Sequence, residues 1–170
     1  MMEEIATIEP RPGEPQERSA APGPGSFAAL VWQKVAARGQ ATALRKKDRG
    51  IWKAVSWREL GDRTREVGMG LAALGVRAGD VACVLSETNP EWVYADLGIL
   101  GLGAICAGIY PTSAPAQVEY VLRDCDARVL FAEDYEQLDK ALEVRERCPA
   151  PFRPRRRRYS PRRRCSSPSA

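Results

Sequence analysis

Short apolar runs alternate with amphipathic segments from residue 57 onward, and this order constrains the fold more than any other feature. The three apolar runs are residues 81–85, 104–110 and 127–132. Continuous apolar strands that alternate with amphipathic helices are typical of a parallel sheet covered by helices on both faces. The sequence therefore predicts an α/β fold with a doubly wound, mostly parallel sheet.

Helix-start signals precede the expected helices. Ser56 and Glu59 fit a capping box, in which each side chain accepts the other's free backbone N–H. Asn89 followed by Pro90 gives an N-cap and a proline at the first helical position. Asp134 is the N-cap expected for the last helix. Two pairs in that helix have the favourable i,i+4 spacing of opposite charges: Glu136/Lys140 and Glu143/Arg147.

The helix that follows Ser56 is predicted to bury one face. Gly75 stands where a glycine commonly ends a helix. Gly61, Gly68 and Gly70 would weaken this helix in isolation, so we expect neighbouring backbone to pack closely against it. The residues of the predicted buried face recur at intervals of three and four: Trp57, Leu60, Thr64, Val67, Leu71 and Leu74.

A short helix and a hairpin are expected before residue 56. Ser26 is the predicted N-cap of the helix, which Gly39 ends. Residues 41–47 and 51–55 are the predicted strands. The segment between them, Asp48-Arg49-Gly50, carries the glycine that a tight turn needs.

The formal net charge of +4 combines two unlike parts. The chain has 26 Lys+Arg against 22 Asp+Glu, but eight of the arginines lie in residues 151–170, which contain no acid. Residues 1–150 therefore carry a net charge of −4, and proline is concentrated at both ends. We expect a disordered Pro/Gly-rich leader (1–25), one globular segment (26–150) and a disordered Arg/Pro/Ser-rich tail (151–170).

Histidine is absent from the chain, which excludes every catalytic relay and zinc site that needs it. The five cysteines include no Cys-x-x-Cys pair, so a zinc site made of cysteines alone is not predicted. The odd number of cysteines and the acidic start without an apolar leader indicate reduced thiols. We therefore expect a cytoplasmic protein.

Residues 92–110 form a mostly apolar stretch of 19 residues, close to the length of a membrane span. Asp96 lies inside it, where a charge would cost about 3 kcal/mol on insertion scales. Gly101 and Gly103 also divide the stretch. We therefore favour a buried helix followed by a strand over a transmembrane span.

No residue is predicted as catalytic, cofactor-binding or metal-binding. The sequence has no Gly-x-Gly-x-x-Gly after a strand and no Gly-x-x-x-x-Gly-Lys-Ser/Thr, the phosphate loops of many nucleotide enzymes. Asp124 and Asp126 flank Cys125 as a candidate acidic site, but a solvated turn explains them better. The lysines stand in polar contexts that favour exposure, and none is predicted to be catalytic: Lys34, Lys46, Lys47, Lys53 and Lys140.

A series of short segments nevertheless follows a specific order and spacing along residues 27–150. The segments are Trp52, 55–60, 70–76, 79–81, 89–92, 103–104, 108–113, 117–122 and 127–134. Together they resemble the N-terminal part of AMP-forming acyl-CoA synthetases, the adenylate-forming ligases, and most closely the long-chain fatty acid type. The resemblance implies that the predicted sheet is an incomplete subdomain of a larger enzyme.

The resemblance also implies a reaction in two halves. ATP and a fatty acid give an acyl-adenylate and pyrophosphate, and coenzyme A then takes the acyl group as a thioester, with magnesium screening the phosphates. In the family, the phosphate loop, the ribose-binding Asp and the catalytic Lys come later in the chain, so no residue here receives their roles. The matching residues are framework residues, with Ser56 and Asn89 as helix caps. We therefore expect this chain to be inactive alone, and its sequence does not give the acyl-chain length.

The resemblance stops after Pro149. Of the 20 residues in 151–170, 16 are Arg, Pro or Ser, as out-of-frame translation of GC-rich DNA tends to give. We therefore expect a frameshifted or truncated gene product. An alternative is binding of nucleic acid through the basic runs Arg155–Arg158 and Arg162–Arg164. A non-catalytic interaction domain is a third interpretation.

Overall fold

The computed structural model describes residues 25–148. The basic tail predicted for residues 151–170 lies outside the described residues, as does the predicted leader except for its last residue. The described part contains the expected helices and strands in the expected order. They are α1 (Phe27–Arg38), β1 (Thr42–Asp48), β2 (Ile51–Ser56), α2 (Trp57–Ala73), β3 (Val81–Leu85), α3 (Pro90–Gly101), β4 (Ile105–Ile109), α4 (Pro115–Asp124), β5 (Val129–Ala132), α5 (Tyr135–Val144) and the 3-10 turn η1 (Arg145–Arg147).

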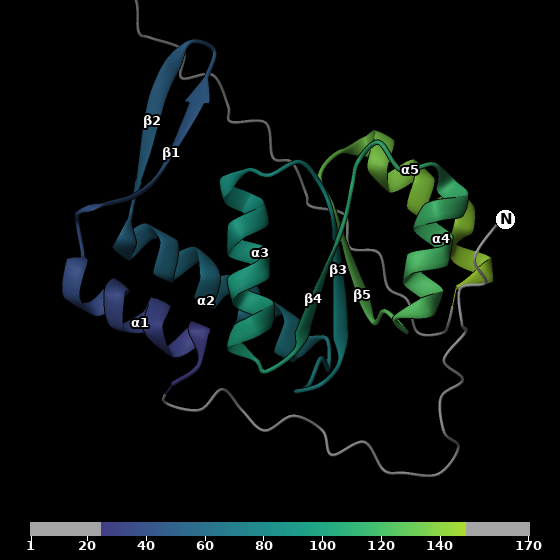
Figure 1. The fold of residues 1–170 in the computed structure, drawn as a ribbon, viewed down its shortest axis with the longest axis horizontal. Coiled ribbons are helices and arrows are strands. Elements are labelled where there is room, and N and C mark those ends of the chain that lie inside the picture. Colours follow the sequence, from purple (N-terminus) through teal and green to yellow (C-terminus); the bar gives the residue numbers. More distant parts are fainter. Residues whose placement is uncertain (1–24, 149–170) are drawn as a thin grey trace, which may run out of the picture.

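Strands β4, β3 and β5 form a three-stranded sheet in that spatial order, and both strand pairs are parallel. Helices α2 and α3 lie on one side of the sheet, and α4 and α5 lie on the other (Figure 1). The prediction of a doubly wound α/β fold with helices on both faces is confirmed. Within the described residues, β4 and β5 each keep one edge without a strand partner.

The central strand β3 is buried on both faces. Ala82 and Val84 face the cluster that contains Leu71 and Ile99. The alternate residues Cys83 and Leu85 face the second cluster, with α4 and α5. Successive side chains of a strand point to opposite faces, so one apolar strand supplies the centre of both cores.

The predicted helix starts are confirmed by hydrogen bonds at four N-caps. In each, a side-chain oxygen accepts a backbone N–H three residues later, one of the donors that a helix N-terminus leaves free. Because these bonds involve neighbouring residues only, the start signals could be identified from the sequence. The caps are Ser26 Oγ to Ala29 N (3.2 Å), Ser56 Oγ to Glu59 N (3.1 Å), Asn89 Oδ1 to Trp92 N (2.8 Å) and Asp134 Oδ1 to Gln137 N (3.0 Å).

Close packing requires a glycine at one of the three positions singled out in α2. A Cβ on Gly61 would lie 2.7 Å from Val35 Cγ1 of α1, which is a side chain and not the expected backbone. Backbone does lie beside Gly68, but a Cβ there would make an ordinary contact of 3.5 Å with the Gly98 carbonyl oxygen of α3. The expectation is wrong for Gly70, where a Cβ would meet no atom within 4 Å.

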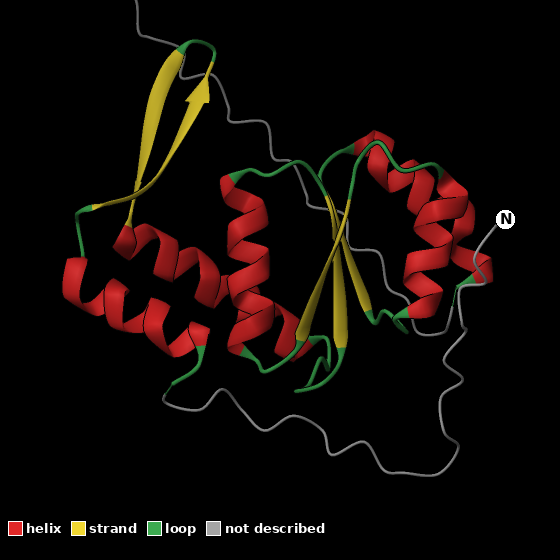
Figure 2. Cartoon of the chain, viewed as in Figure 1, coloured by secondary structure: helices red, strands yellow, loops and turns green. Residues whose placement is uncertain are grey.

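The predicted hairpin is confirmed as the antiparallel pair β1–β2, which projects from the body of the molecule (Figure 2). Arg49 (φ 48°) and Gly50 (φ 84°) both adopt positive φ in its turn. Two consecutive residues with positive φ are characteristic of the tight type I′ turn.

The apolar stretch 92–110 folds as the C-terminal part of α3, a turn and β4, as predicted. None of the helices in residues 25–148 combines the length and the apolar character needed to cross a bilayer.

The ion pairs of α5 follow the prediction only in part. Lys140 Nζ lies 3.2 Å from Glu136 Oε1, as expected. Arg147 instead pairs with Glu119 of α4, at 2.7 Å. Helix α5 ends at Val144 and continues as a 3-10 turn, so the α-helical spacing expected of Glu143 and Arg147 is lost.

Four cysteines lie in the described residues, all of them free thiols. Cys83 is fully buried, and its Sγ lies 3.6 Å from that of Cys125. Burial, followed by the neighbouring Cys125 thiol, raises the pKa of the Cys83 thiol. Burial, together with the nearby Asp96 carboxyl, also raises the pKa of Cys106 to about 12.

We predict that Leu85→Ala lowers the free energy of unfolding by about 2–5 kcal/mol, the usual cost of truncating a fully buried leucine. Leu85 is 0% exposed. The matched control is Leu142→Ala on α5, where the side chain is 37% exposed, and there we expect a change below about 1 kcal/mol. Urea denaturation followed by circular dichroism measures both values. Equal losses in the two variants would contradict the assignment of Leu85 to the core.

We also predict a fall in stability above pH 9 that depends on Cys106. Because its folded-state pKa is raised from 9.0 to about 12, folding favours the protonated thiol. This stabilisation is complete below pH 9 and disappears as the pH rises toward 12. In Cys106→Ala, the free energy of unfolding should therefore fall less steeply between pH 9 and 11 than in the unmodified chain. Identical slopes in denaturation series would rule out this contribution.

Candidate functional site

A cleft of about 750 Å³ lies at the carboxyl end of the parallel sheet. Its walls come from the hairpin, from α2 and α3, and from the loops that follow β3 and β5. Trp92 and Phe131 contribute apolar surface, while most of the remaining wall is charged or polar. This cleft is the candidate functional site of the described residues.

The position of the cleft follows from the strand order. β3 and β5 are neighbours, but the chain leaves β3 into α3 on one face of the sheet and leaves β5 into α5 on the other. Loops that diverge in this way open a crevice at the carboxyl ends of the strands, where ligands of open α/β sheets commonly bind.

Glu133 bridges this crevice. Its Oε2 accepts hydrogen bonds from the Glu87 backbone N–H (2.8 Å) and from Ser86 Oγ (3.2 Å). Its Oε1 accepts one from Asn89 Nδ2 (2.9 Å). The Glu133 backbone N–H also donates to the Leu85 carbonyl (3.1 Å). One carboxylate at the end of β5 therefore holds the whole β3–α3 loop.

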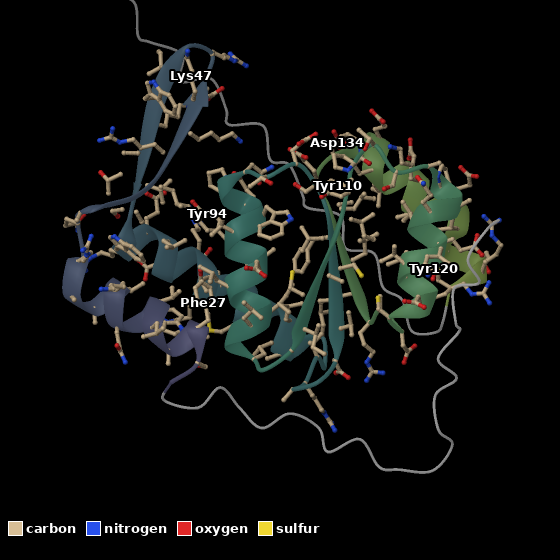
Figure 3. All side chains as sticks on the ribbon, in the orientation of Figure 1. Phe27, Lys47, Tyr94, Tyr110, Tyr120 and Asp134 are labelled. Carbon is tan, nitrogen blue, oxygen red and sulfur yellow. The ribbon has the colours of Figure 1, made fainter. Side chains whose placement is uncertain are left out.

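Carboxylates or amide oxygens also stand at the helix N-termini that open on this edge. Asn89 caps α3, with Glu91 in the first turn, and Asp134 caps α5, with Glu136 in its first turn. Tyr110 and Asp134 follow β4 and β5 and both lie at this end of the sheet (Figure 3). A helix N-terminus binds an anion through its free N–H groups, and here the Asn89 and Asp134 side chains each accept one of them, from Trp92 and from Gln137.

Acidic groups outnumber basic groups in the cleft. Two acid–base contacts line it: Lys46 Nζ lies 3.8 Å from Glu91, and Arg63 lies 3.0 Å from Glu66. Two further carboxylates, those of Glu59 and Glu133, have no cation beside them among these contacts.

Tyr94 on α3 lies in this region (Figure 3). Burial, followed by the negative charges of Glu59 and Glu91, raises the pKa of the Tyr94 hydroxyl. The raised pKa has the direction expected beside excess carboxylates, so it agrees with the acidic character of this wall.

These residues do not fit the phosphates of ATP. Phosphate binding relies on cations, free backbone N–H groups or both, whereas the cleft has excess carboxylate and capped helices. In residues 25–148, no group of three His, Cys, Asp or Glu side chains is placed to hold a metal ion. We therefore assign no step of nucleotide chemistry to these residues.

Most residues considered as site candidates in the sequence have the structural roles predicted for them. Ser56 and Asn89 are helix caps. Asp124 is the exposed last residue of α4, and Asp126, two residues later, adopts φ 49° in the turn before β5, so the turn interpretation is confirmed. The expectation of exposure is wrong for Lys140, whose side chain is only 18% exposed. Its Nζ donates to the Pro111 carbonyl (2.7 Å) and ties α5 to the loop after β4.

The residue of this cleft that the sequence did not single out is Glu133, whose carboxylate accepts hydrogen bonds from the β3–α3 loop. Glu133 belongs to segment 127–134, one of the segments that resemble the ligases, and the sequence predicts it to be a framework residue. One local signal was present: a carboxylate directly after a buried strand stands at the carboxyl edge of a parallel sheet. Its partners were not predictable, because they lie 44 to 47 residues away in the chain.

We predict that Glu133→Gln loosens the β3–α3 loop without unfolding the chain. The amide has one accepting oxygen where the carboxylate uses two, so it cannot keep all three hydrogen bonds from the β3–α3 loop, and we expect a loss of about 1 kcal/mol. Hydrogen exchange should be faster at the Glu87 amide and unchanged in β3. Glu146→Gln, on the exposed η1 turn, is the control with the same charge change. Unaltered exchange at Glu87 would show that Glu133 does not hold this loop.

The amino-acid sequence of the chain is similar to those of long-chain-fatty-acid–CoA ligases. The chain is 40% identical over 101 residues to the long-chain-fatty-acid–CoA ligase FadD15 of Mycobacterium bovis, an alignment that covers 59% of this chain and 17% of that protein. It is 31% identical over 106 residues to the long-chain-fatty-acid–CoA ligase ACSBG1 of Rattus norvegicus, covering 62% and 15% respectively. The matches thus span less than a fifth of the length of these relatives.

The fold is also similar to that of solved ligases. The crystal structure of the anthranilate CoA ligase AuaEII in complex with anthranoyl-AMP matches with a TM-score of 0.66 and 34% sequence identity, over 72% of this chain and 23% of that one. The family model described as AMP-binding enzyme matches residues 31–161. This match takes in most of the sequence, so the chain belongs to the AMP-binding enzyme family.

Proposed function

We propose that this chain is the N-terminal framework of a long-chain-fatty-acid–CoA ligase and that it does not catalyse the ligation alone. Similarity to two long-chain-fatty-acid–CoA ligases over residues that form the sheet and its helices supports the substrate class. The observation that carries the framework role is the acidic, capped carboxyl edge of the sheet, where Glu133 accepts hydrogen bonds from the β3–α3 loop.

The chemistry explains why such a chain would be inactive alone. Formation of an acyl-adenylate moves negative charge between a carboxylate and the phosphates of ATP, and cations or backbone N–H groups must stabilise that charge in the transition state. The cleft instead offers four carboxylates against two cations, Lys46 and Arg63, which already pair with Glu91 and Glu66. Residues beyond the framework would have to supply the positive groups.

In this role the framework holds the carboxyl edge of the sheet rigid. Its two cores fix the sheet, and the Glu133 bridge holds the β3–α3 loop against β5. A loop fixed in this way presents a rigid wall to whatever packs on the carboxyl edge. Catalytic groups positioned on rigid elements keep the geometry on which rate acceleration depends.

A chimera tests the framework role directly. In this chimera, the 101 matched residues of FadD15 from Mycobacterium bovis are replaced by the corresponding residues of this chain. The chimera should form palmitoyl-CoA from palmitate, ATP and coenzyme A within about tenfold of the parent rate, a loss of about 1.4 kcal/mol of transition-state stabilisation.

The control chimera carries Leu85→Asp, which places a charge in the core and should abolish activity by unfolding the framework. The isolated 170-residue chain should show no ATP–pyrophosphate exchange with palmitate and magnesium. Exchange by the isolated chain would contradict the framework-only role. A chimera that is folded by circular dichroism but forms no palmitoyl-CoA would contradict the proposed ligase.

A further inference from the structure

Two cysteine side chains meet in the core between the sheet and helices α4 and α5. Cys83 stands in the middle of β3, and Cys125 is the C-cap residue of α4. Their Sγ atoms lie 3.6 Å apart, close enough for direct contact. The two residues are 42 positions apart in the chain, so only the folded sheet and the helix that covers it bring these thiols together.

Two further thiols of the described residues occupy different positions. Cys106 is opposite Ala82 in the sheet register, so its side chain belongs to the face that α2 and α3 cover. Cys83 belongs to the opposite face. Cys148 packs against the same cluster as Cys83 and Cys125. The partner of Cys125 is therefore Cys83 by contact, and Cys148 is the competitor that a test must exclude.

The two thiols of the pair differ in their access to solvent. Cys83 is 0% exposed, and burial, followed by the Cys125 thiol, raises its pKa, which keeps Cys83 protonated. Cys125 is half-buried, and the exposed carboxylates of Asp124 and Asp126 flank it. Because the thiolate is the reactive form of cysteine, Cys125 is the thiol that an oxidant reaches first. The flanking negative charges favour an uncharged oxidant over an anionic one.

We propose that Cys83 and Cys125 form a disulfide when the chain is exposed to hydrogen peroxide, and that this bond joins α4 covalently to β3. First, the Cys125 thiolate attacks one peroxide oxygen and the O–O bond breaks. Cys125 becomes a sulfenic acid, and the released hydroxide takes up the proton that Cys125 had lost. The Cys83 sulfur then attacks Cys125 Sγ, the S–O bond breaks, and hydroxide leaves as water with the Cys83 proton. The two thiols are oxidised by two electrons, and one peroxide is reduced to two waters.

The fold favours the second step because it holds the two sulfur atoms together. Strand β3 pairs with β4 on one edge and with β5 on the other, so the backbone of Cys83 is fixed. A reacting group held in contact behaves as if it were highly concentrated. The sulfur atoms must still approach from 3.6 Å to about 2.05 Å. Cys125 stands at the end of its helix, where the chain turns, so this side of the pair can make the movement.

The bond would change the stability of the chain. Between the two cysteines lie α3, β4 and α4, and a disulfide closes all of them into one loop. Closing a long loop restricts the unfolded chain more than the folded one. The oxidised chain should therefore unfold at a higher urea concentration than the reduced chain, and a thiol reductant should reverse the change.

The experiment is peptide mapping of the full 170-residue chain after treatment with hydrogen peroxide and blocking of the remaining thiols. Trypsin together with a glutamate-specific protease places Cys83, Cys106, Cys125 and Cys148 in separate peptides, so mass spectrometry identifies the linked pair. We expect the peptides of Cys83 and Cys125 to be joined. Urea denaturation of the same sample should show a raised midpoint that dithiothreitol returns to the value of the reduced chain.

Thiol counting on variants tests which residues react. The background variant Cys148→Ser/Cys165→Ser keeps three thiols, and peroxide should remove two of them. The matched control adds Cys106→Ser, and there the loss of two thiols should remain. The test variant adds Cys125→Ser instead, and thiol loss should be about tenfold slower or more, because the buried Cys83 has no partner in contact. Circular dichroism checks that each variant is folded.

Three outcomes would overturn the proposal. One is a peptide map in which Cys125 is linked to Cys106, to Cys148 or to a second chain instead of to Cys83. Another is oxidation of Cys125 to sulfinic acid without a link. The third is thiol loss that is equally fast in the background and in the Cys125→Ser variant. The map of the unmodified chain decides the pairing even where a variant fails to fold.

Discussion

Strand β3 is hydrogen-bonded on both edges and covered on both faces, and the two helical layers depend on this one strand. Its residues alternate between the clusters: Ala82 and Val84 pack toward α2 and α3, and Cys83 and Leu85 pack toward α4 and α5. A slip of one residue would exchange the two sets and place each in the wrong core. Burial on both sides therefore fixes the register of the sheet and the positions of four helices.

The same topology determines the electrostatics of the carboxyl edge. Since α3 and α5 leave neighbouring strands toward opposite faces, a crevice opens between their loops, and Glu133 joins the two loops by accepting hydrogen bonds from Ser86, Glu87 and Asn89. Asn89 and Asp134 occupy the helix N-termini beside it. An edge arranged in this way is rigid and acidic. It suits a scaffold within an adenylate-forming ligase better than a site that holds phosphate.

Much of the fold could be predicted because its signals are local. The cap at Asn89 depends on Trp92 three residues later, and the hairpin turn depends on Arg49 and Gly50, which adopt positive φ. The failures concern contacts between distant segments. Lys140 donates a hydrogen bond to the Pro111 carbonyl, and Arg147 forms an ion pair with Glu119 across the interface between α4 and α5.

By itself, the sequence determined where helices and strands begin, that three strands run parallel, and which family the segments resemble. Capping, periodicity and apolar runs act over a few residues, so a linear chain displays them. Only the tertiary structure decided the strand order β4-β3-β5, which buries β3 but leaves Ile105 of the edge strand β4 53% exposed, and the partners of Glu133. These depend on which way α4 carries the chain past β3, and no local pattern specifies that path.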